Sequence, residues 1–283
     1  MKRIVWLTLI AAGLAATAAG AGSLSLPFRS GSTARSQSPG PMEYRTHCAA
    51  WGDPQPENAT VNPRPLVWIL DGAGDLKGCS QSLDGVNTLA GEQMELVVYP
   101  WSHGHRRLLM DQIGMTHARE QGSRLASAIL ARKAQEPNRR LVIVAHSAGC
   151  AVALAAGDLL PIDAVDRILL LAPSVSTGYD IRPTLWSAKE GVDVFCSTKD
   201  WVALGFVVKV VRTTDNIWSG EAAGRWGFKP KGSNALAELE TQRLRQHFWT
   251  QDLAWTGNTG GHHGSHAPEF VKTYLLPLML GQK

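Results

Sequence analysis

The stretch LVIVAHSAGC, residues 141–150, decides the fold of this chain. Its first five residues form a continuous apolar run the length of a strand, rich in valine, isoleucine and leucine. Continuous runs of this kind are typical of strands that are covered on both faces of a parallel sheet. The run leads into Ser147, and the small residues Ala145 and Gly149 stand two positions to either side of it. This pattern predicts a buried strand that turns abruptly into a helix, with Ser147 at the turn.

Four more apolar runs have the same length and character, at residues 66–70, 95–99, 167–171 and 192–196. Residues 117–135 carry apolar side chains at helical spacing, after Thr116 as a candidate cap and before Pro137. A last helix is expected to begin at Pro268. Strands that alternate with helices predict a doubly wound α/β fold, with a mostly parallel sheet and helices on both faces. In such a sheet, functional residues gather at the carboxyl ends of the strands.

The composition indicates a globular protein with a sizeable core. The chain has 283 residues, of which 44% are hydrophobic and 18% are charged. The 28 basic residues exceed the 24 acidic residues by only four, and they are evenly spread along the chain. A nucleic-acid-binding protein would gather its basic residues on one face, so this function is not expected. Four cysteines without a C-x-x-C pair exclude both a disulfide framework and a structural zinc site.

The amino terminus has the pattern of an export signal. Lys2 and Arg3 precede an uncharged stretch that ends in small residues, so residues 1–21 are interpreted as a signal peptide and the protein as exported. The alternative is an uncleaved membrane anchor. An association with a membrane is expected only in that case. Residues 22–42 are rich in Ser, Gly and Pro and are expected to form a flexible linker before a single domain at 43–283.

Export bears on the cysteines. An oxidising compartment would allow Cys48 and Cys79 to form a disulfide. Cys150 and Cys196 lie in apolar surroundings and are expected to be small buried hydrophobic residues.

The pentapeptide at residues 145–149 resembles the nucleophile elbow G-x-S-x-G of the α/β-hydrolase superfamily, of the serine esterase and lipase type. Ala145 replaces the first glycine, and its additional methyl group is tolerable where the facing residue is also small. The resemblance implies the α/β-hydrolase fold with Ser147 as the nucleophile. It also implies a triad in the chain order serine, acid, histidine, with the acid after a later strand and the histidine near the final helix.

Asp200 follows the apolar run at 192–196 and occupies the position that the resemblance implies for the acid. Asp180 lies in the loop after the preceding strand, a location that some members of the superfamily use, and is the alternative. Asp193 lies inside the run itself and is expected to be structural.

Three histidines precede Pro268, and the triad needs one of them. His262 follows a glycine at the distance from the final helix that is usual in the superfamily, so it is the expected base. His263 and His266 are the runners-up. A metal site built from these three histidines is a further alternative, but no carboxylate or cysteine is near them in the sequence, and neither a metal nor a cofactor is expected.

An oxyanion hole needs two backbone N–H donors. The resemblance implies Ala148, directly after the nucleophile, and Ala73, in the glycine-rich loop after residues 66–70. Substrate contacts are expected from His103 and His146, and from Trp201 in the long aromatic-rich stretch between Asp200 and His262. This stretch is expected to form a wall or lid of the substrate pocket.

Together these features predict an exported serine hydrolase that cleaves small carboxylic esters through an acyl-enzyme. An acyltransferase with the same triad is one alternative, because the sequence does not distinguish water from an alcohol acceptor. A noncatalytic binding protein of the same fold is the other, and it would be indicated by the loss of a triad residue.

Overall fold

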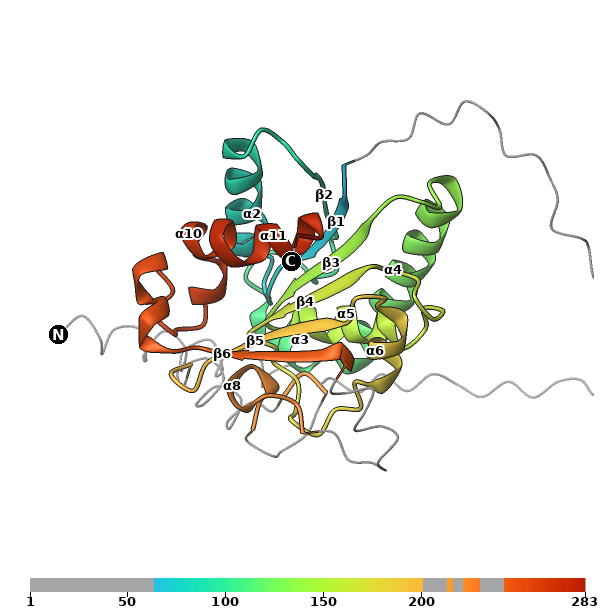
Figure 1. The fold of residues 1–283 in the computed structure, drawn as a ribbon. Helices are drawn as coiled ribbons and strands as arrows, with labels where there is room; N and C mark the ends of the chain where they lie inside the picture. Colours follow the sequence, from blue (N-terminus) through green and yellow to red (C-terminus); the bar gives the residue numbers. More distant parts are fainter. Residues whose placement is uncertain (1–63, 201–212, 216–220, 230–241, 283) are drawn as a thin grey trace, which may run out of the picture. The chain divides into compact units, whose positions relative to one another are not determined.

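The computed structural model describes residues 64–200, 213–215, 221–229 and 242–282. Six strands of this part form a sheet in the order β2-β1-β3-β4-β5-β6, in which all neighbouring strands are parallel (Figure 1). The strands are β1 (Leu66–Leu70), β2 (Glu95–Val98), β3 (Leu141–His146), β4 (Arg167–Leu171), β5 (Val192–Cys196) and β6 (Leu244–Phe248). The predicted parallel sheet is confirmed, and the five apolar runs form β1 to β5.

Helices cover both faces of the sheet, so the predicted doubly wound architecture is also confirmed. One face packs against α4 (Met115–Gln135), α5 (Gly149–Gly157), α6 (Arg182–Ser187) and α8 (Ala223–Trp226). The other packs against α2 (Gly78–Leu89), α10 (Pro268–Phe270), the π-helical turn η4 (Val271–Leu275) and α11 (Leu276–Leu280). Within β3, Ile143 joins the first core and Val142 and Val144 join the second, as the alternation of side chains along a strand requires.

The order of the strands sets the position of a functional site. The chain moves from β1 outward to β2, and then returns past β1 to β3 and continues in the opposite direction. The carboxyl ends of β1 and β3 therefore flank the point where the strand order reverses. Ligands of open α/β sheets bind at such points. The loop with Gly72 and Ala73 follows β1, and Ser147 follows β3, so both lie at this reversal.

The helix after Ser147 is held closely. Every residue of α5 is buried, and α5 packs along α4. A Cβ atom on Gly122 of α4 would lie only 2.6 Å from the Cβ of Ala155. The small residues of α5 and α4 thus allow a close approach of the two helices, which fixes the helix that carries the turn at Ser147.

Some boundaries differ from the sequence-based expectation. Helix α4 begins at Met115, and no side chain caps it, so the predicted cap at Thr116 is wrong. The last helix does begin at Pro268, but it changes to a π-helical turn before Pro277. Proline has no N–H and its ring crowds the preceding turn of an α-helix, which accounts for the wider turn.

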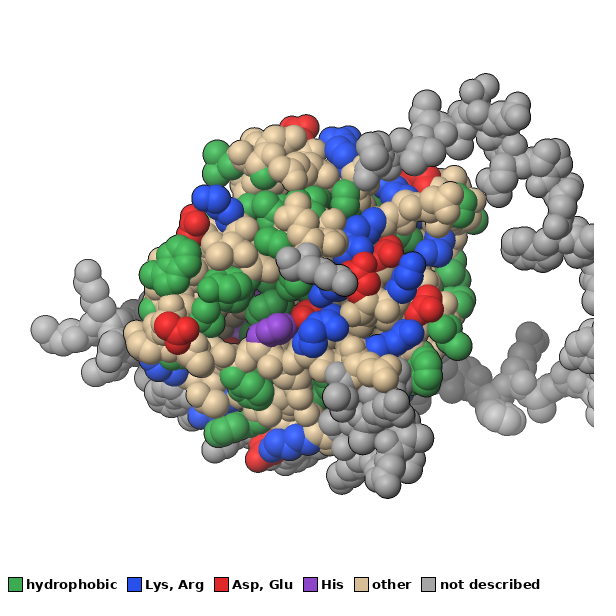
Figure 2. Space-filling view, viewed as in Figure 1, with side chains coloured by type: hydrophobic (Ala, Val, Ile, Leu, Met, Phe, Trp, Pro, Cys, Tyr) green, Lys and Arg blue, Asp and Glu red, His purple; other side chains and the backbone are tan. Residues whose placement is uncertain are grey.

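Charged side chains of both signs interleave at the amino ends of the strands, where Figure 2 shows blue and red atoms side by side. Asp193 is buried there and accepts hydrogen bonds at 2.8 Å from Arg167, Arg245 and His247. Burial raises the pKa of Asp193, but the hydrogen bonds from Arg245 and His247 outweigh it and hold the pKa well below its usual range. The expectation that Asp193 is structural agrees with this position, far from the carboxyl ends of the strands.

Cys150 and Cys196 are buried, as expected. Cys79 is a buried free thiol in α2, whereas its predicted partner Cys48 lies outside the described residues. The predicted signal peptide (1–21), the linker (22–42) and Trp201 also lie outside them. Among the helices of the described residues, none has the length and apolar character needed to span a membrane.

Candidate active site

Ser147 occupies a sharp turn between β3 and α5. Its φ angle is 54°, in the left-handed region that side chains other than glycine rarely adopt. The turn is held by the Ser147 N–H, which donates to the carbonyl of Leu171 at 2.9 Å, and by the Ser147 carbonyl, which accepts from Ser174 at 3.2 Å. Strain of this kind persists only where the surroundings enforce it and is concentrated at functional sites.

Two glycines make room for this turn. A Cβ atom on Gly149 would lie 2.5 Å from the carbonyl oxygen of Asp71 and 2.8 Å from that of Leu70. A Cβ atom on Gly72 would lie 2.9 Å from Nδ1 of His146. The turn and the end of β1 therefore approach each other too closely for any side chain. Ala145 is fully buried in β3 at the position of the first glycine of the motif, so its extra methyl group is accommodated.

We expect Gly149→Ala to destabilise the fold by about 1–3 kcal/mol, because the new methyl group must displace backbone atoms of β1. The measurement is the free energy of unfolding in urea. Gly85→Ala is the matched control, since a Cβ atom at Gly85 meets nothing within 4 Å on the exposed side of α2. This control should be neutral or slightly stabilising, and equal destabilisation by the two changes would contradict the close approach.

The structure brings Ser147, His262 and Asp200 together. Nε2 of His262 lies 2.8 Å from Oγ of Ser147, and Nδ1 of His262 lies 2.6 Å from Oδ2 of Asp200. Because a carboxylate only accepts hydrogen bonds, Nδ1 carries the proton and Nε2 is free to accept from the serine hydroxyl. Ser147 and Asp200 are buried, and the His262 side chain is 15% exposed. The three groups form one chain of hydrogen bonds with the histidine at its centre.

Loop contacts position the acid and the histidine. Asp200 ends the turn after β5, where its N–H donates to the Ser197 carbonyl at 3.1 Å. The Ser197 hydroxyl donates to the carbonyl of Gly260 at 2.6 Å, which joins this turn to the loop that carries His262. Asp180, the alternative acid, is exposed and paired with Arg182. The hydrogen-bond geometry therefore favours Asp200.

The other two histidines of the loop lie beside His146, not beside Ser147. His266 is buried and its ring packs edge-on against that of His146, with centroids 4.7 Å apart. His263 is exposed, and its Nδ1 lies 3.2 Å from Nε2 of His266. Burial lowers the pKa of His266 to about 4 and, with smaller effects from the neighbouring histidines, also lowers the pKa of His146.

His146 does not have the position expected of a substrate contact. Its ring is buried and its Nε2 donates to the carbonyl of His262 at 3.0 Å. The ring lies beside that of His262, with centroids 4.8 Å apart, and His146 is the last residue of β3. His146 is better explained as a support for the loop that carries His262.

The expected oxyanion donors Ala148 and Ala73 follow β3 and β1, the two neighbouring strands between which the strand order reverses. Ala148 is the first residue after Ser147, at the start of α5, and Ala73 follows Gly72, which lies against Ser147. Among the described residues, neither backbone N–H has a hydrogen-bond partner in the fold. Both donors are thus available to a ligand.

A residue that sequence reasoning missed holds the Ala73 loop in place. Asp111, buried in α3 (Leu108–Ile113), accepts hydrogen bonds from the N–H of Gly74 at 2.7 Å and from the hydroxyl of Ser102 at 2.5 Å. It also accepts from the backbone N–H of His103 at 2.9 Å and from Nδ1 of His103 at 2.8 Å. Burial raises the pKa of Asp111, but these hydrogen bonds outweigh it and lower the pKa below its ordinary value.

These contacts give His103 a defined place. Its ring is stacked on that of His117 with centroids 3.7 Å apart, and Nε2 of His117 donates to the carbonyl of Trp101 at 2.6 Å. His103 shares its carboxylate partner with the Ala73 loop, so it lies beside the expected oxyanion hole. Its expected contact with substrate stays a prediction.

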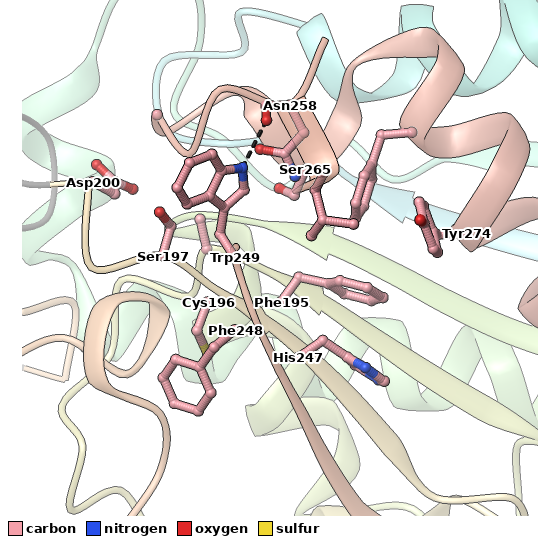
Figure 3. Close-up of a pocket in the computed structure, with 14 residues that line it drawn as sticks. Phe195, Cys196, Ser197, Asp200, His247, Phe248, Trp249, Asn258, Ser265 and Tyr274 are labelled. Atoms are coloured by element: carbon pink, nitrogen blue, oxygen red, sulfur yellow. Dashed lines mark hydrogen bonds between the residues drawn. The ribbon is translucent and has the colours of Figure 1, made fainter. Parts of the chain in front are cut away.

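A cavity of about 210 Å³ lies beside the triad acid, and Asp200 is part of its lining (Figure 3). Its lining is mostly apolar and includes Phe195, Phe248 and Trp249, whose indole N–H donates to the carbonyl of Asn258 at 2.7 Å. Neither Ser147 nor His262 belongs to the described lining. Residues of the aromatic-rich stretch thus form a cavity next to the acid, while the expectation that they enclose the substrate stays a prediction.

Three features of this site belong together: a parallel sheet with a reversal in strand order, a left-handed serine at a strand-to-helix turn, and an acid and a histidine that follow it in that order. The described part of the chain has a doubly wound, all-parallel α/β fold, and its site resembles that of the α/β-hydrolases.

Comparisons with known proteins give distant similarities. No family model and no curated protein matches the chain. Among solved structures, it is similar to a CIB-like hydrolase from Thermoplasma acidophilum, with 15% identity and a TM-score of 0.42 over 78% of this chain and 89% of the other. It is also similar to a cutinase-like protein from Cryptococcus sp., with 12% identity and a TM-score of 0.40 over 79% and 98%. An esterase from Thermogutta terrifontis gives 11% identity and a TM-score of 0.41 over 80% and 82%.

Proposed function

We propose that this protein is a serine hydrolase that cleaves carboxylic esters of small molecules through an acyl-enzyme. The observation that carries the proposal is the chain of hydrogen bonds from Ser147 through His262 to Asp200, at 2.8 Å and 2.6 Å. In this arrangement His262 is the base, and Asp200 holds it in the tautomer that can accept the serine proton. We infer no metal or cofactor for this reaction.

The reaction proceeds in two halves. Oγ of Ser147 attacks the ester carbonyl carbon while Nε2 of His262 takes its proton, and the resulting imidazolium is stabilised by Asp200. The tetrahedral oxyanion accepts hydrogen bonds from the N–H groups of Ala148 and Ala73. His262 then gives the proton to the alcohol oxygen as the C–O bond breaks. Water, deprotonated by the same histidine, attacks the acyl-enzyme and releases the acid and the free serine.

The test is hydrolysis of p-nitrophenyl acetate and butyrate by the purified chain, with product analysis. We expect the released acyl group to appear mainly as the free acid, also when a simple alcohol is added. Predominant transfer to the alcohol would favour the acyltransferase alternative. Failure to turn over any ester of a short-chain and medium-chain panel would contradict the proposal and favour a binding protein of the same fold.

We also propose that the protein is exported by its segment at residues 1–21. Two basic residues before an uncharged stretch support this, and no nucleic acid is among the expected partners. Expression of the full chain, followed by fractionation and sequencing of the amino terminus, tests it. Recovery of the intact chain from the cytosol would contradict export, and recovery of the intact chain in membranes would favour the anchor.

The oxyanion loop gives a further prediction. We expect Asp111→Asn to lower kcat roughly tenfold to a hundredfold with a smaller effect on KM, because the amide cannot accept all the hydrogen bonds that fix Gly74 and hence Ala73. Steady-state kinetics on one ester give both constants. The matched control is Asp166→Asn, which removes a carboxylate that accepts from the N–H of Leu141 at the opposite end of the sheet. A rise in KM with an unchanged kcat would contradict the assignment. Equal losses of kcat in the two variants would contradict it as well.

A further inference from the structure

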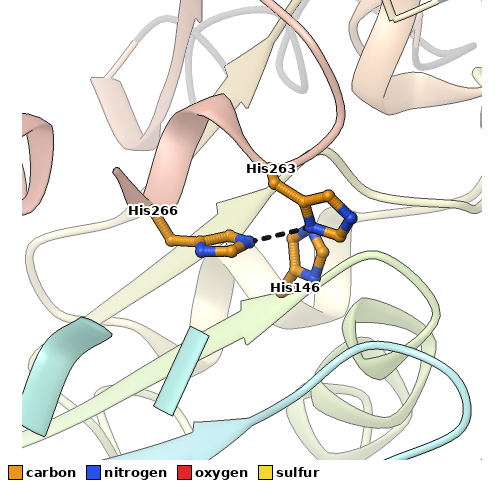
Figure 4. A group of neighbouring side chains, drawn as sticks. All are labelled: His146, His263 and His266. Atoms are coloured by element: carbon orange, nitrogen blue, oxygen red, sulfur yellow. Dashed lines mark hydrogen bonds between the residues drawn. The ribbon is translucent and has the colours of Figure 1, made fainter. Parts of the chain in front are cut away.

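Beside His262, three histidine side chains converge from two parts of the chain (Figure 4). His146 comes from the end of β3, and His263 and His266 come from the loop and short 3-10 helix η3 (Gly264–His266) before α10. One ring nitrogen from each lies within 4.8 Å of the others. None of the three is part of the hydrogen-bond chain between Ser147 and Asp200.

Two nitrogens of the cluster face each other across a hydrogen bond, in which one of them carries the proton, so a metal ion that bound both would displace that proton. Nδ1 of His263 and Nε2 of His266 lie 3.2 Å apart. Two nitrogens bound to one tetrahedral zinc ion, at metal–nitrogen distances of about 2.0–2.1 Å, would be roughly 3.3 Å apart. The present separation of these two nitrogens therefore fits an edge of a tetrahedral site. The exposed ring of His263 leaves the cluster open to solvent on one side, which gives an ion a path of entry.

His146 has the outer contact that metal-bound histidines usually have. A carbonyl oxygen only accepts, so the Nε2 of His146 carries the proton that is donated to the carbonyl of His262. Its Nδ1 is then the unprotonated nitrogen of the ring. Histidines that bind metals almost always donate their other N–H to a carbonyl or carboxylate, which fixes the tautomer and the ring orientation.

We propose that His146, His263 and His266 form a binding site for a divalent transition-metal ion of the zinc type. Three imidazoles with one open position are a frequent ligand set for zinc. Neutral imidazoles are the form of histidine that binds such an ion. Binding of the ion does not depend on the proposed ester hydrolysis.

The site is coupled to the triad through the chain. The three nitrogens lie within 4.8 Å of one another, whereas the edge of a tetrahedral zinc site is roughly 3.3 Å, so a bound ion draws together any pair that lies farther apart than this edge. His262 lies between the two parts: its side chain is bonded to Ser147, its carbonyl accepts from His146, and it is the neighbour of His263. Bound zinc therefore displaces the base and lowers kcat.

The first experiment measures binding without reference to activity. The untagged Ser147→Ala protein is stripped with a chelator and titrated with Co²⁺, whose visible spectrum reports the coordination geometry. We expect one ion per chain, strong tetrahedral bands, and displacement of Co²⁺ by Zn²⁺. His263→Ala removes an exposed ligand without disturbing the core, so it should fold and bind roughly 10- to 100-fold more weakly.

His105→Ala is the matched control, because His105 is an exposed histidine outside the cluster. It should bind as the parent protein does. The absence of tetrahedral bands, or equal binding by His263→Ala and the parent protein, would overturn the site. With Ser147 restored, Zn²⁺ should lower kcat, and it should do so less in His263→Ala. Equal inhibition of the two would show that the ion acts at the triad instead and would overturn the coupling.

Discussion

Replacement of His262 by alanine is expected to lower kcat/KM for esters by roughly 10⁴- to 10⁶-fold, as the loss of a triad histidine does in serine hydrolases. His262 is the only ring in the described part of the chain whose nitrogen is hydrogen-bonded to the Ser147 hydroxyl. Without it the hydroxyl keeps its proton and is a weak nucleophile. The measurement is steady-state kinetics on a p-nitrophenyl ester, in the presence of a chelator.

The neighbouring histidines provide the comparison. His263→Ala and His266→Ala should cost far less, because both rings lie beside His146 and away from the serine hydroxyl. His105→Ala serves as an exposed control. If His263→Ala or His266→Ala abolished the activity while His262→Ala retained it, the assignment of the base would be wrong.

Asp200→Asn should lower kcat roughly 10⁴-fold while the fold is retained, as this replacement does in a serine protease triad. The carboxylate accepts the Nδ1 proton of His262 at 2.6 Å and so leaves Nε2 unprotonated for Ser147. An amide can donate to Nδ1, which stabilises the opposite tautomer, with the proton on the nitrogen that must act as the base.

The control for this change is Asp180→Asn, since Asp180 is the exposed acid that the sequence offers as the alternative. It should leave kcat near that of the parent protein. Thermal unfolding of both variants separates a loss of catalysis from a loss of folding. A large loss in Asp180→Asn together with a small loss in Asp200→Asn would contradict the acid assigned to the triad.

Much of the fold could be predicted because its signals are local. Each of the five strands β1 to β5 is a short, mostly apolar run, which is typical of the strands of a parallel sheet, although β2 lies at an edge and is only partly buried. The turn at Ser147 is also local, because small neighbours at fixed positions are needed wherever a residue with φ of 54° joins a strand to a helix.

Strand β6 could not be found in this way. It is an edge strand of the described sheet, and its sequence LRQHF lacks an apolar run. Arg245 and His247 alternate with its other residues and pair with the buried Asp193 of β5. The alternation is that of a strand, but the polar side chains are explained only by a partner that is distant in the sequence.

The same reason explains what was missed in the site. Asp111 acts on Gly74, which is 37 residues away, and no pattern around Asp111 indicates that contact. The three histidines after Gly261 are equivalent by composition, and the resemblance to the superfamily favoured His262 by its position alone. Their different roles arise from which ring reaches Ser147 and which rings pack against His146, and this is decided by tertiary structure.

The central claim is that Ser147 is an activated nucleophile. Its most direct test is to label the purified protein with a fluorophosphonate and to locate the adduct by peptide mass spectrometry. We expect a single adduct on Ser147, at a rate that falls strongly in His262→Ala, and no adduct in Ser147→Ala. An adduct that persists in Ser147→Ala, or that maps to another residue of the parent protein, would contradict it.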